Sequence, residues 1–464
     1  MKLKERLSRI NLPARASMAY LGVSFIGKII GILATPFFTR LISPEEYGSL
    51  ILYLTILGGA SIICSAISSG SAIYRCFKVF DEKSNDFLLS ALIISIGFSL
   101  LICILLFAFL PFTALNRQLY LPLCLQIICD SIIGVSLSRA RYRYRYGEVA
   151  TISLISSALP VILSLTVIKR FGCGCGVRVY SMLIISIVIA LIQILRILRF
   201  SGRFNGKMAG YMLKSSIPML SHSISVAFSG QADKLFITWI MGTTALAKYS
   251  VAHSLGMALQ FAITALGSAL GPWLIRKLHS NEIKKASKVI FTAFILFCAA
   301  SVVLSILSPE AMKILAPSDY LSALPAVIPI ALSIPLSFLS YTVTVGLVHS
   351  EKGGCNALIS IFGTIICLAL NYTLIPKIGY TGAGFSILLS QFLQTLMGIL
   401  LLRRANLSEM IRPKPIAIVF SITSIISFVA YGLYSELSLR VILLIIPALV
   451  FISALFRSKR LIIE

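Results

Sequence analysis

The chain has 464 residues, of which 58% are hydrophobic and only 12% are charged, and its formal net charge is +25. This composition excludes a soluble globular protein. The positive charge does not indicate a nucleic-acid-binding protein either, because the basic residues are dispersed over short segments and form no basic domain or recognisable binding module.

Long apolar runs follow one another along the whole chain. Each approaches or exceeds the ~20 residues that a helix needs to cross about 30 Å of hydrocarbon. We therefore predict an all-α integral membrane protein with about 14 transmembrane helices, and 12 is the alternative count. The predicted spans are residues 18–38, 48–69, 87–111, 119–138, 149–168, 179–198, 216–242, 246–275, 289–308, 323–349, 355–375, 380–402, 415–434 and 438–456.

The basic residues divide unequally between the two sides of this bundle. Thirty of the 41 Lys and Arg residues fall in the termini and in every second gap between spans, whereas nine fall in the opposite gaps. The positive-inside rule places the more basic side, and with it both the N- and C-termini, in the cytoplasm. The two remaining cations, Lys28 and Lys234, lie inside predicted spans.

A coarse internal repeat relates the first and seventh spans. Residues 40–48 and 239–250 each contain an outward-facing helix end, a short polar turn, a Tyr and the start of the next span. This pattern predicts two pseudo-symmetric six-helix lobes related by an axis along the membrane normal, joined by the basic segment 196–214. The predicted boundaries are 1–205 for the N-terminal lobe, 206–412 for the C-terminal lobe, and 413–464 for two additional transmembrane helices and a cytoplasmic tail.

Four charged residues are predicted at bilayer depth: Lys28, Asp130, Asp233 and Lys234. A charge there costs about 2.5–3.5 kcal/mol on insertion scales, so such residues face protein or a water-filled cavity. Lys28 lies about 15 Å into the first span at 1.5 Å per residue. We interpret these residues as candidates for function. The structural alternative is an ion pair of Lys28 with Asp130 or Asp233 that only holds the bundle together.

Polar residues extend the candidate set. The seventh span carries His222 and Gln231 among several serines, which is typical of a helix that lines an aqueous cavity. His222 is either a hydrogen-bonded interior residue or a proton relay. Arg40 and Arg276 flank spans at opposite faces, where each is either a headgroup anchor or a ligand contact.

Motifs for catalysis and ATP hydrolysis are missing from the sequence. It contains no phosphate-binding GxxxxGK[ST] loop, no HExxH metal motif and no GxSxG nucleophile elbow. It also has no filter-like segment of the kind that a channel requires. We therefore expect a secondary transporter or flippase rather than an enzyme, and we expect no cofactor.

Three motifs carry a family resemblance: residues 39–48 (TRLISPEEYG), residues 230–234 (GQADK) followed by residues 249–252 (YSVA), and residues 376–383 (PKIGYTGA). In order, spacing and predicted side they resemble the Wzx-type polysaccharide repeat-unit flippases, such as O-antigen flippases, of the multidrug/oligosaccharidyl-lipid/polysaccharide exporter superfamily. The resemblance covers most of the chain up to about residue 402. Many such flippases have 12 spans, so the count of 14 leaves closer kinship to the lipid II flippase branch open.

The resemblance implies a flippase that moves an undecaprenyl-pyrophosphate-linked oligosaccharide repeat unit from the cytoplasmic to the periplasmic leaflet of the cell inner membrane by alternating access. In that case Lys28 and Lys234, with Arg40 and Arg276, would offset the charge of the pyrophosphate. Coupling to H⁺ or Na⁺ is left open, with Asp130 and Asp233 as the candidate sites. Membrane lipids are expected partners, and a glycan polymerase and a chain-length regulator are further ones.

Two other classes of protein remain as alternatives. A cation-coupled multidrug exporter of the same superfamily would call for a net acidic cavity, whereas two Lys face two Asp in these spans. A non-transporting scaffold or a polymerase subunit of glycan assembly is the alternative outside transport. A glycan polymerase would be expected to carry a large periplasmic loop, which the predicted spans do not leave room for.

Overall fold

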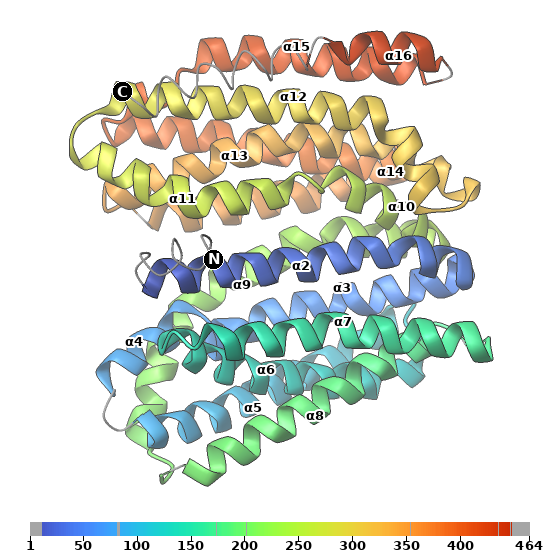
Figure 1. The fold of residues 1–464 in the computed structure, drawn as a ribbon. Helices are drawn as coiled ribbons and strands as arrows, with labels where there is room; N and C mark the ends of the chain where they lie inside the picture. Colours follow the sequence, from blue (N-terminus) through green and yellow to red (C-terminus); the bar gives the residue numbers. More distant parts are fainter. Residues whose placement is uncertain are drawn as a thin grey trace, which may run out of the picture. The chain divides into compact units, whose positions relative to one another are not determined.

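Figure 1 shows the chain in a computed structural model, which describes residues 12–80, 84–172, 174–200, 202–352, 354–434, 436–445 and 447. The described residues form helices and short 3-10 turns, with no strand among them. The prediction of an all-α fold is therefore confirmed for these residues.

Ten segments of the described residues are long and apolar enough to cross a membrane. The longest of them, Gly354–Arg404, has 51 residues and is kinked at Ile378 and Gly379, so it provides the length of two crossings. The total of 14 spans and the cytoplasmic side of the termini stay predictions.

The chain divides into two compact units. The N-terminal unit consists of Met1–Gln231 with Gly242–Ala247, and the C-terminal unit consists of Ala232–Met241 with Lys248–Glu464. The predicted lobe boundaries stay a prediction.

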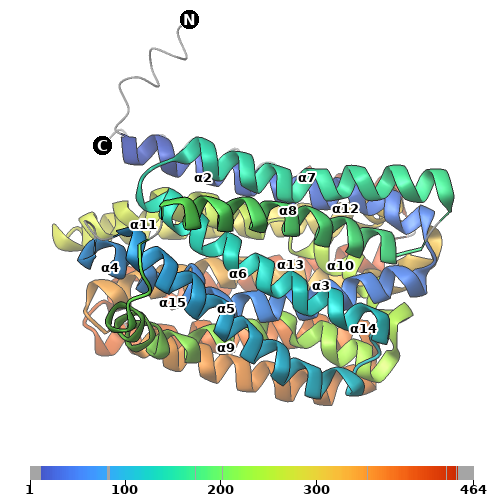
Figure 2. The same cartoon turned by 90° about the horizontal axis from the view of Figure 1, so that it is seen from below.

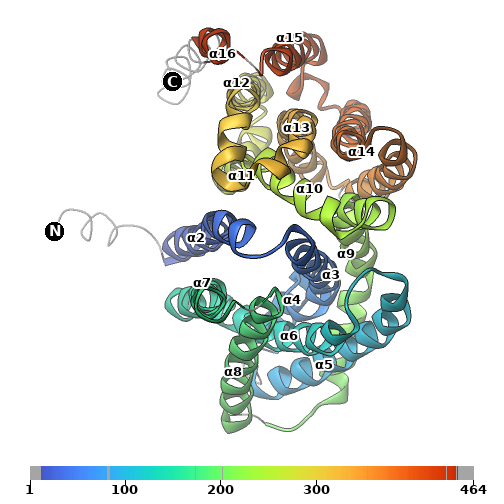
Figure 3. The same cartoon turned by 90° about the vertical axis from the view of Figure 1, so that its right-hand side faces the viewer.

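In the N-terminal unit, α6 lies at the centre and packs against α3, α5 and α8, while α2 packs along α7 (Figure 3). Figure 2 shows α2 and α7 running side by side over their length. Apolar residues such as Phe77 of α4, Phe87 of α5 and Ile133 of α6 belong to the hydrophobic core of this unit. The helices are α2 (Leu12–Leu41), α3 (Pro44–Ser68), α4 (Ser71–Val79), α5 (Ser84–Phe109), α6 (Tyr120–Tyr142), α7 (Tyr146–Phe171), α8 (Gly176–Phe200) and α9 (Gly206–Met241) as far as Gln231.

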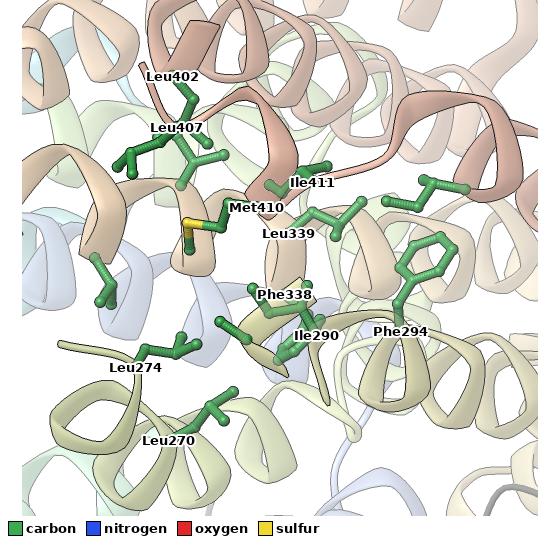
Figure 4. Packing of buried hydrophobic residues seen from close by; sticks show 14 of the residues in the cluster. Leu270, Leu274, Ile290, Phe294, Phe338, Leu339, Leu402, Leu407, Met410 and Ile411 are labelled. Carbon is green, nitrogen blue, oxygen red and sulfur yellow. The ribbon is translucent and has the colours of Figure 1, made fainter. Parts of the chain in front are cut away.

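In the C-terminal unit, α13 is the most enclosed helix and packs against α11, α12, α14 and α15. Figure 4 shows its residues Phe338 and Leu339 packed with Ile290 and Phe294 of α12 and with Leu274 of α11. After the end of α9, the helices are α10 (Thr243–Gly256) from Lys248, α11 (Gln260–His279), α12 (Ile283–Leu315), α13 (Val327–His349), α14 (Gly354–Arg404), α15 (Pro413–Gly432) and α16 (Leu437–Leu443).

The motif of residues 39–48 forms the turn between α2 and α3. Ser43 is the N-cap of α3, and its hydroxyl accepts a 3.2 Å hydrogen bond from the backbone N–H of Glu46. Pro44 and two glutamates fill the first turn, as favoured at a helix N-terminus. Gly48 is required by close packing, because a Cβ there would overlap the carbonyl of Thr243.

The motif of residues 376–383 forms the kink in α14. Ile378 and Gly379 have non-helical backbone angles, and the φ of Gly379 is +57°, which favours glycine. The prediction of a short turn between the spans 355–375 and 380–402 agrees with this geometry.

Three segments show local structure that the sequence did not predict. The span 246–275 lies in one candidate membrane crossing, Thr243–His279, but its helix is interrupted after Gly256, where the backbone shifts to i→i+3 hydrogen bonds. The predicted linker 196–214 includes the end of α8 and the start of α9, where Oδ1 of Asn205 accepts a hydrogen bond from the N–H of Lys207. Helix α4 was predicted as part of a loop. The last predicted span, 438–456, lies largely outside the described residues.

Candidate functional site

A buried acid of the C-terminal unit has two titratable partners. Asp233 of α9 is 3% exposed. The hydroxyl of Tyr249 donates a 2.5 Å hydrogen bond to its Oδ2, and Nε2 of His253 lies 3.6 Å from the same oxygen. Tyr249 and His253 are four residues apart in α10, so one face of that helix presents both side chains. We call these three residues the Asp233 cluster.

The Asp233 cluster brings a carboxyl group, a phenol and an imidazole together. The imidazole of His253, whose side chain is 16% exposed, is the kind of group that exchanges protons near neutral pH, whereas the phenol of Tyr249 serves as a hydrogen-bond donor. Tyr249 is completely buried. Asp233 was predicted, whereas His253 was missed. Its signal was the i, i+4 spacing of a Tyr and a His in an apolar segment.

The predicted acid of the N-terminal unit, Asp130, is surrounded by uncharged partners. Nε2 of Gln126 donates to Oδ1 of Asp130 at 2.9 Å and also lies 2.7 Å from Oγ of Ser186. The hydroxyl of Ser61 donates to Oδ2 of Asp130 at 3.4 Å. These four residues, the Asp130 cluster, join α3, α6 and α8 and place a carboxylate among neutral donors.

The two predicted cations of α2 differ in setting. Lys28 lies about 20 Å from the C-terminal end of α2 at 1.5 Å per residue, and its side chain is exposed on this unit. Arg40 is in the last turn, where Nη1 donates a 3.0 Å hydrogen bond to the carbonyl of Pro36. That contact gives Arg40 a local role, because a cation stabilises a helix C-terminus.

The other predicted residues of α9 face different directions. His222 is exposed and Gln231 is half-buried, and Nε2 of Gln231 would lie 3.3 Å from a Cβ at Gly58 of α3. Lys234 is half-buried although its neighbour Asp233 is buried. This difference follows from the ~100° between successive helical side chains.

Arg276 is exposed in the last turn of α11. The next residue, Lys277, donates a 2.8 Å hydrogen bond to Oε1 of Glu282, and Lys285 lies 3.3 Å from Oε2. The hydrogen bond from Lys277 lowers the pKa of Glu282 below its ordinary value. This turn is therefore a network of basic residues around one carboxylate, with Arg276 beside it.

Comparison with known proteins gives the family. Residues 14–278 match the family described as polysaccharide biosynthesis protein, and this match covers more than half of the chain. A protein of the Lsg locus of Haemophilus influenzae is 22% identical over 380 residues, which are 79% of this chain and 93% of that protein.

Solved structures give the fold. The lipid II flippase MurJ in an inward closed conformation matches with a TM-score of 0.74 and 15% identity, over 96% of this chain and 100% of that one. An inward-facing multidrug resistance MATE transporter of the MOP superfamily matches with a TM-score of 0.66 and 15% identity, over 85% of this chain and 98% of that one. The protein is thus a multi-pass membrane protein with the fold of these transporters, and it belongs to the polysaccharide biosynthesis protein family.

Proposed function

We propose that the protein is a flippase, and not an enzyme, that moves undecaprenyl-pyrophosphate-linked oligosaccharide repeat units from the cytoplasmic to the periplasmic leaflet of the inner membrane by alternating access. The family match over residues 14–278 carries this proposal, because it links the chain to polysaccharide assembly. The all-helical fold supports transport as the contribution to that assembly.

Two cations in apolar helices support an anionic substrate. Lys28 is exposed in the middle of α2, and Lys234 is half-buried in α9. A charge at such depth costs about 2.5–3.5 kcal/mol on insertion scales, so its retention calls for a partner or a function. An ammonium group would offset the desolvation of a pyrophosphate through charge-assisted hydrogen bonds. Arg40 and Arg276 are proposed to contribute nearer the two faces of the membrane.

The energy source is proposed to include the membrane potential. Each charge that moves across 100 mV contributes about 2.3 kcal/mol. A dianion that leaves a negative interior therefore gains on the order of 4–5 kcal/mol. If a proton is exchanged as well, we propose the Asp233 cluster as its site, because an imidazole, which can carry a proton near neutral pH, lies beside the buried carboxyl group.

Related transporters with other substrates are the main rivals. The likeness to MurJ and to MATE transporters, at 15% identity, establishes the fold and leaves the substrate to other evidence. Depletion of the protein in its own cells distinguishes a repeat-unit flippase from a lipid II flippase and from a multidrug exporter. Accumulation of undecaprenyl-linked repeat units on the cytoplasmic side supports the proposal. Accumulation of lipid II, or drug sensitivity alone, would assign the protein to a rival.

The substrate cation is tested by complementation of a flippase-null strain. Lys28→Ala should abolish display of the surface glycan while the protein still inserts, and Lys28→Arg should partly restore it. Lys207→Ala removes an exposed lysine near the start of α9 and serves as the control with unchanged display. Full complementation by Lys28→Ala would show that Lys28 does not bind the substrate.

A further inference from the structure

The N-terminal unit contains a large basic cavity that the proposed transport function does not use. It has a volume of about 1140 Å³ and is formed by the N-terminal ends of α5 and α7 and the C-terminal ends of α6 and α8. Figure 1 shows these helix ends together at one end of the unit. The polar residues that line it are Asn85, Ser136, Arg139, Arg143, Arg145, Glu148, Thr151, Gln193, Arg196 and Arg199.

The cavity has a large excess of positive charge. Five arginines and one glutamate line it, so its formal net charge is +4. The single carboxylate is shared: Nη1 of Arg196 lies 3.1 Å from Oε1 of Glu148, and Nη1 of Arg145 lies 3.8 Å from Oε2. One carboxylate cannot neutralise five guanidinium groups, and guanidinium is the side-chain group best suited to bidentate contacts with phosphate.

Two polar groups of the cavity wall have no hydrogen-bond partner in the part of the chain that the structure describes. Arg139 donates from Nη2 to Oδ1 of Asn85 at 3.0 Å, whereas its Nε is buried and has no partner among the described residues. Ser136, one turn deeper on α6, is 8% exposed, and its hydroxyl likewise has no partner there. Buried donors without partners are costly, so a ligand that accepts hydrogen bonds would stabilise this wall.

The cavity changes from charged to apolar with depth. On α8 the charged lining residues Arg199 and Arg196 lie at the outer end, with Ile197 between them, and Gln193, Ile192 and Ile189 follow. This series spans about 15 Å along the helix at 1.5 Å per residue. A similar gradient runs along α7, where Arg145 and Glu148 are followed by Thr151, Ile152 and Ile155. The outer end thus suits an anion and the inner end suits hydrocarbon.

We propose that this cavity binds the phosphate head of an anionic membrane phospholipid, with the first part of its acyl chains against the isoleucines of α7 and α8. Ile155 and Ile192 are 41% and 44% exposed, so the apolar end opens at the surface of the unit. A free phosphate would satisfy the arginines alone and would leave this apolar wall unused. The positive-inside rule puts the site at the cytoplasmic leaflet, where anionic lipids attract basic segments.

The test is lipid binding to the purified full-length protein, measured by native mass spectrometry. Phosphatidylglycerol is titrated against phosphatidylcholine with the same acyl chains, and inorganic phosphate is added as a competitor. We expect wild type to bind phosphatidylglycerol at least about tenfold more tightly. The double variant Arg139→Ala/Arg196→Ala should lose about tenfold or more in that affinity, because it removes charged hydrogen-bond donors.

Two further variants are expected to raise the affinity for phosphatidylglycerol or to leave it unchanged. Misfolding, which could only lower that affinity, would not produce these results. Glu148→Gln removes the competing carboxylate and should raise phosphatidylglycerol affinity several-fold. Arg75→Ala/Arg203→Ala removes the same charge from exposed arginines of this unit outside the cavity wall, and should leave the affinity within about twofold. Equal binding of phosphatidylcholine, displacement by equimolar phosphate, or no response to Glu148→Gln would each overturn the lipid assignment.

Discussion

The hydrogen bond between Tyr249 and Asp233 gives the sharpest test of the buried cluster. Tyr249→Phe keeps the ring and its packing and removes only the hydroxyl that donates to Oδ2 of Asp233 at 2.5 Å. Tyr249 is 0% exposed and Asp233 is 3% exposed, so water does not replace the lost donor. A hydrogen bond to a charged group contributes about 1.5–3 kcal/mol, and we expect a loss of that size in the free energy of unfolding.

The assay is a double-mutant cycle of Tyr249→Phe and Asp233→Ala, with unfolding followed by SDS titration in mixed micelles. The coupling energy should fall in the same range of about 1.5–3 kcal/mol, because the residues are in direct contact. Tyr53→Phe is the matched control. Tyr53 is also 0% exposed, but its hydroxyl has no hydrogen-bond partner within the described part of the chain. If Tyr249→Phe lowers the free energy of unfolding by no more than Tyr53→Phe does, the hydrogen bond between Tyr249 and Asp233 is refuted.

Three further substitutions address other parts of the chain. Arg440→Ala removes a bidentate pair with Glu310 at 2.7 and 2.9 Å and should lower stability by about 1–3 kcal/mol, measured as thermal unfolding in detergent, with Arg440→Lys intermediate. Gly48→Ala forces a Cβ against the carbonyl of Thr243 and should cost about 1–3 kcal/mol in the same assay. Asp130→Asn keeps its shape among neutral partners, so we expect a change of under about 1 kcal/mol and normal glycan display if Asp130 does not couple transport. Loss of display with unchanged stability would reassign coupling to Asp130.

The helices were predictable because a membrane imposes the same requirement on every span. Each span must be apolar over about 20 residues, and basic residues are enriched in the segments on one side of the membrane. Both patterns can be seen in the sequence. The break after Gly256 was not predictable, because apolar residues continue through it. In the structure a Cβ at Gly256 would overlap the side chain of Ile330 on α13, so the break lies where the chain packs closely against α13. The sequence alone does not show which helices pack together.

The site was predictable only in part, for a related reason. A charge in an apolar span is visible in the sequence, so Asp130 and Asp233 could be named as candidates. Their partners depend on which helix packs beside them. Gln126 is four residues from Asp130 on the same helix and could have been found by spacing, whereas His253 contacts Asp233 only because α10 folds back on α9.

Asp130 and Asp233 differ in whether a neighbouring side chain can carry a proton. Asp130 takes hydrogen bonds from an amide and a hydroxyl, neither of which exchanges protons near neutral pH. Asp233 accepts a hydrogen bond from a phenol and has the Nε2 of an imidazole 3.6 Å away, so of these two acids only Asp233 has, among the described residues, a neighbour that can carry a proton near neutral pH. His253→Gln keeps a polar group of similar reach but removes the proton carrier. If transport is proton-coupled through this cluster, His253→Gln should flatten its pH dependence and leave insertion unchanged. The same flattening from Asp130→Asn, with His253→Gln unaffected, would reverse the assignment.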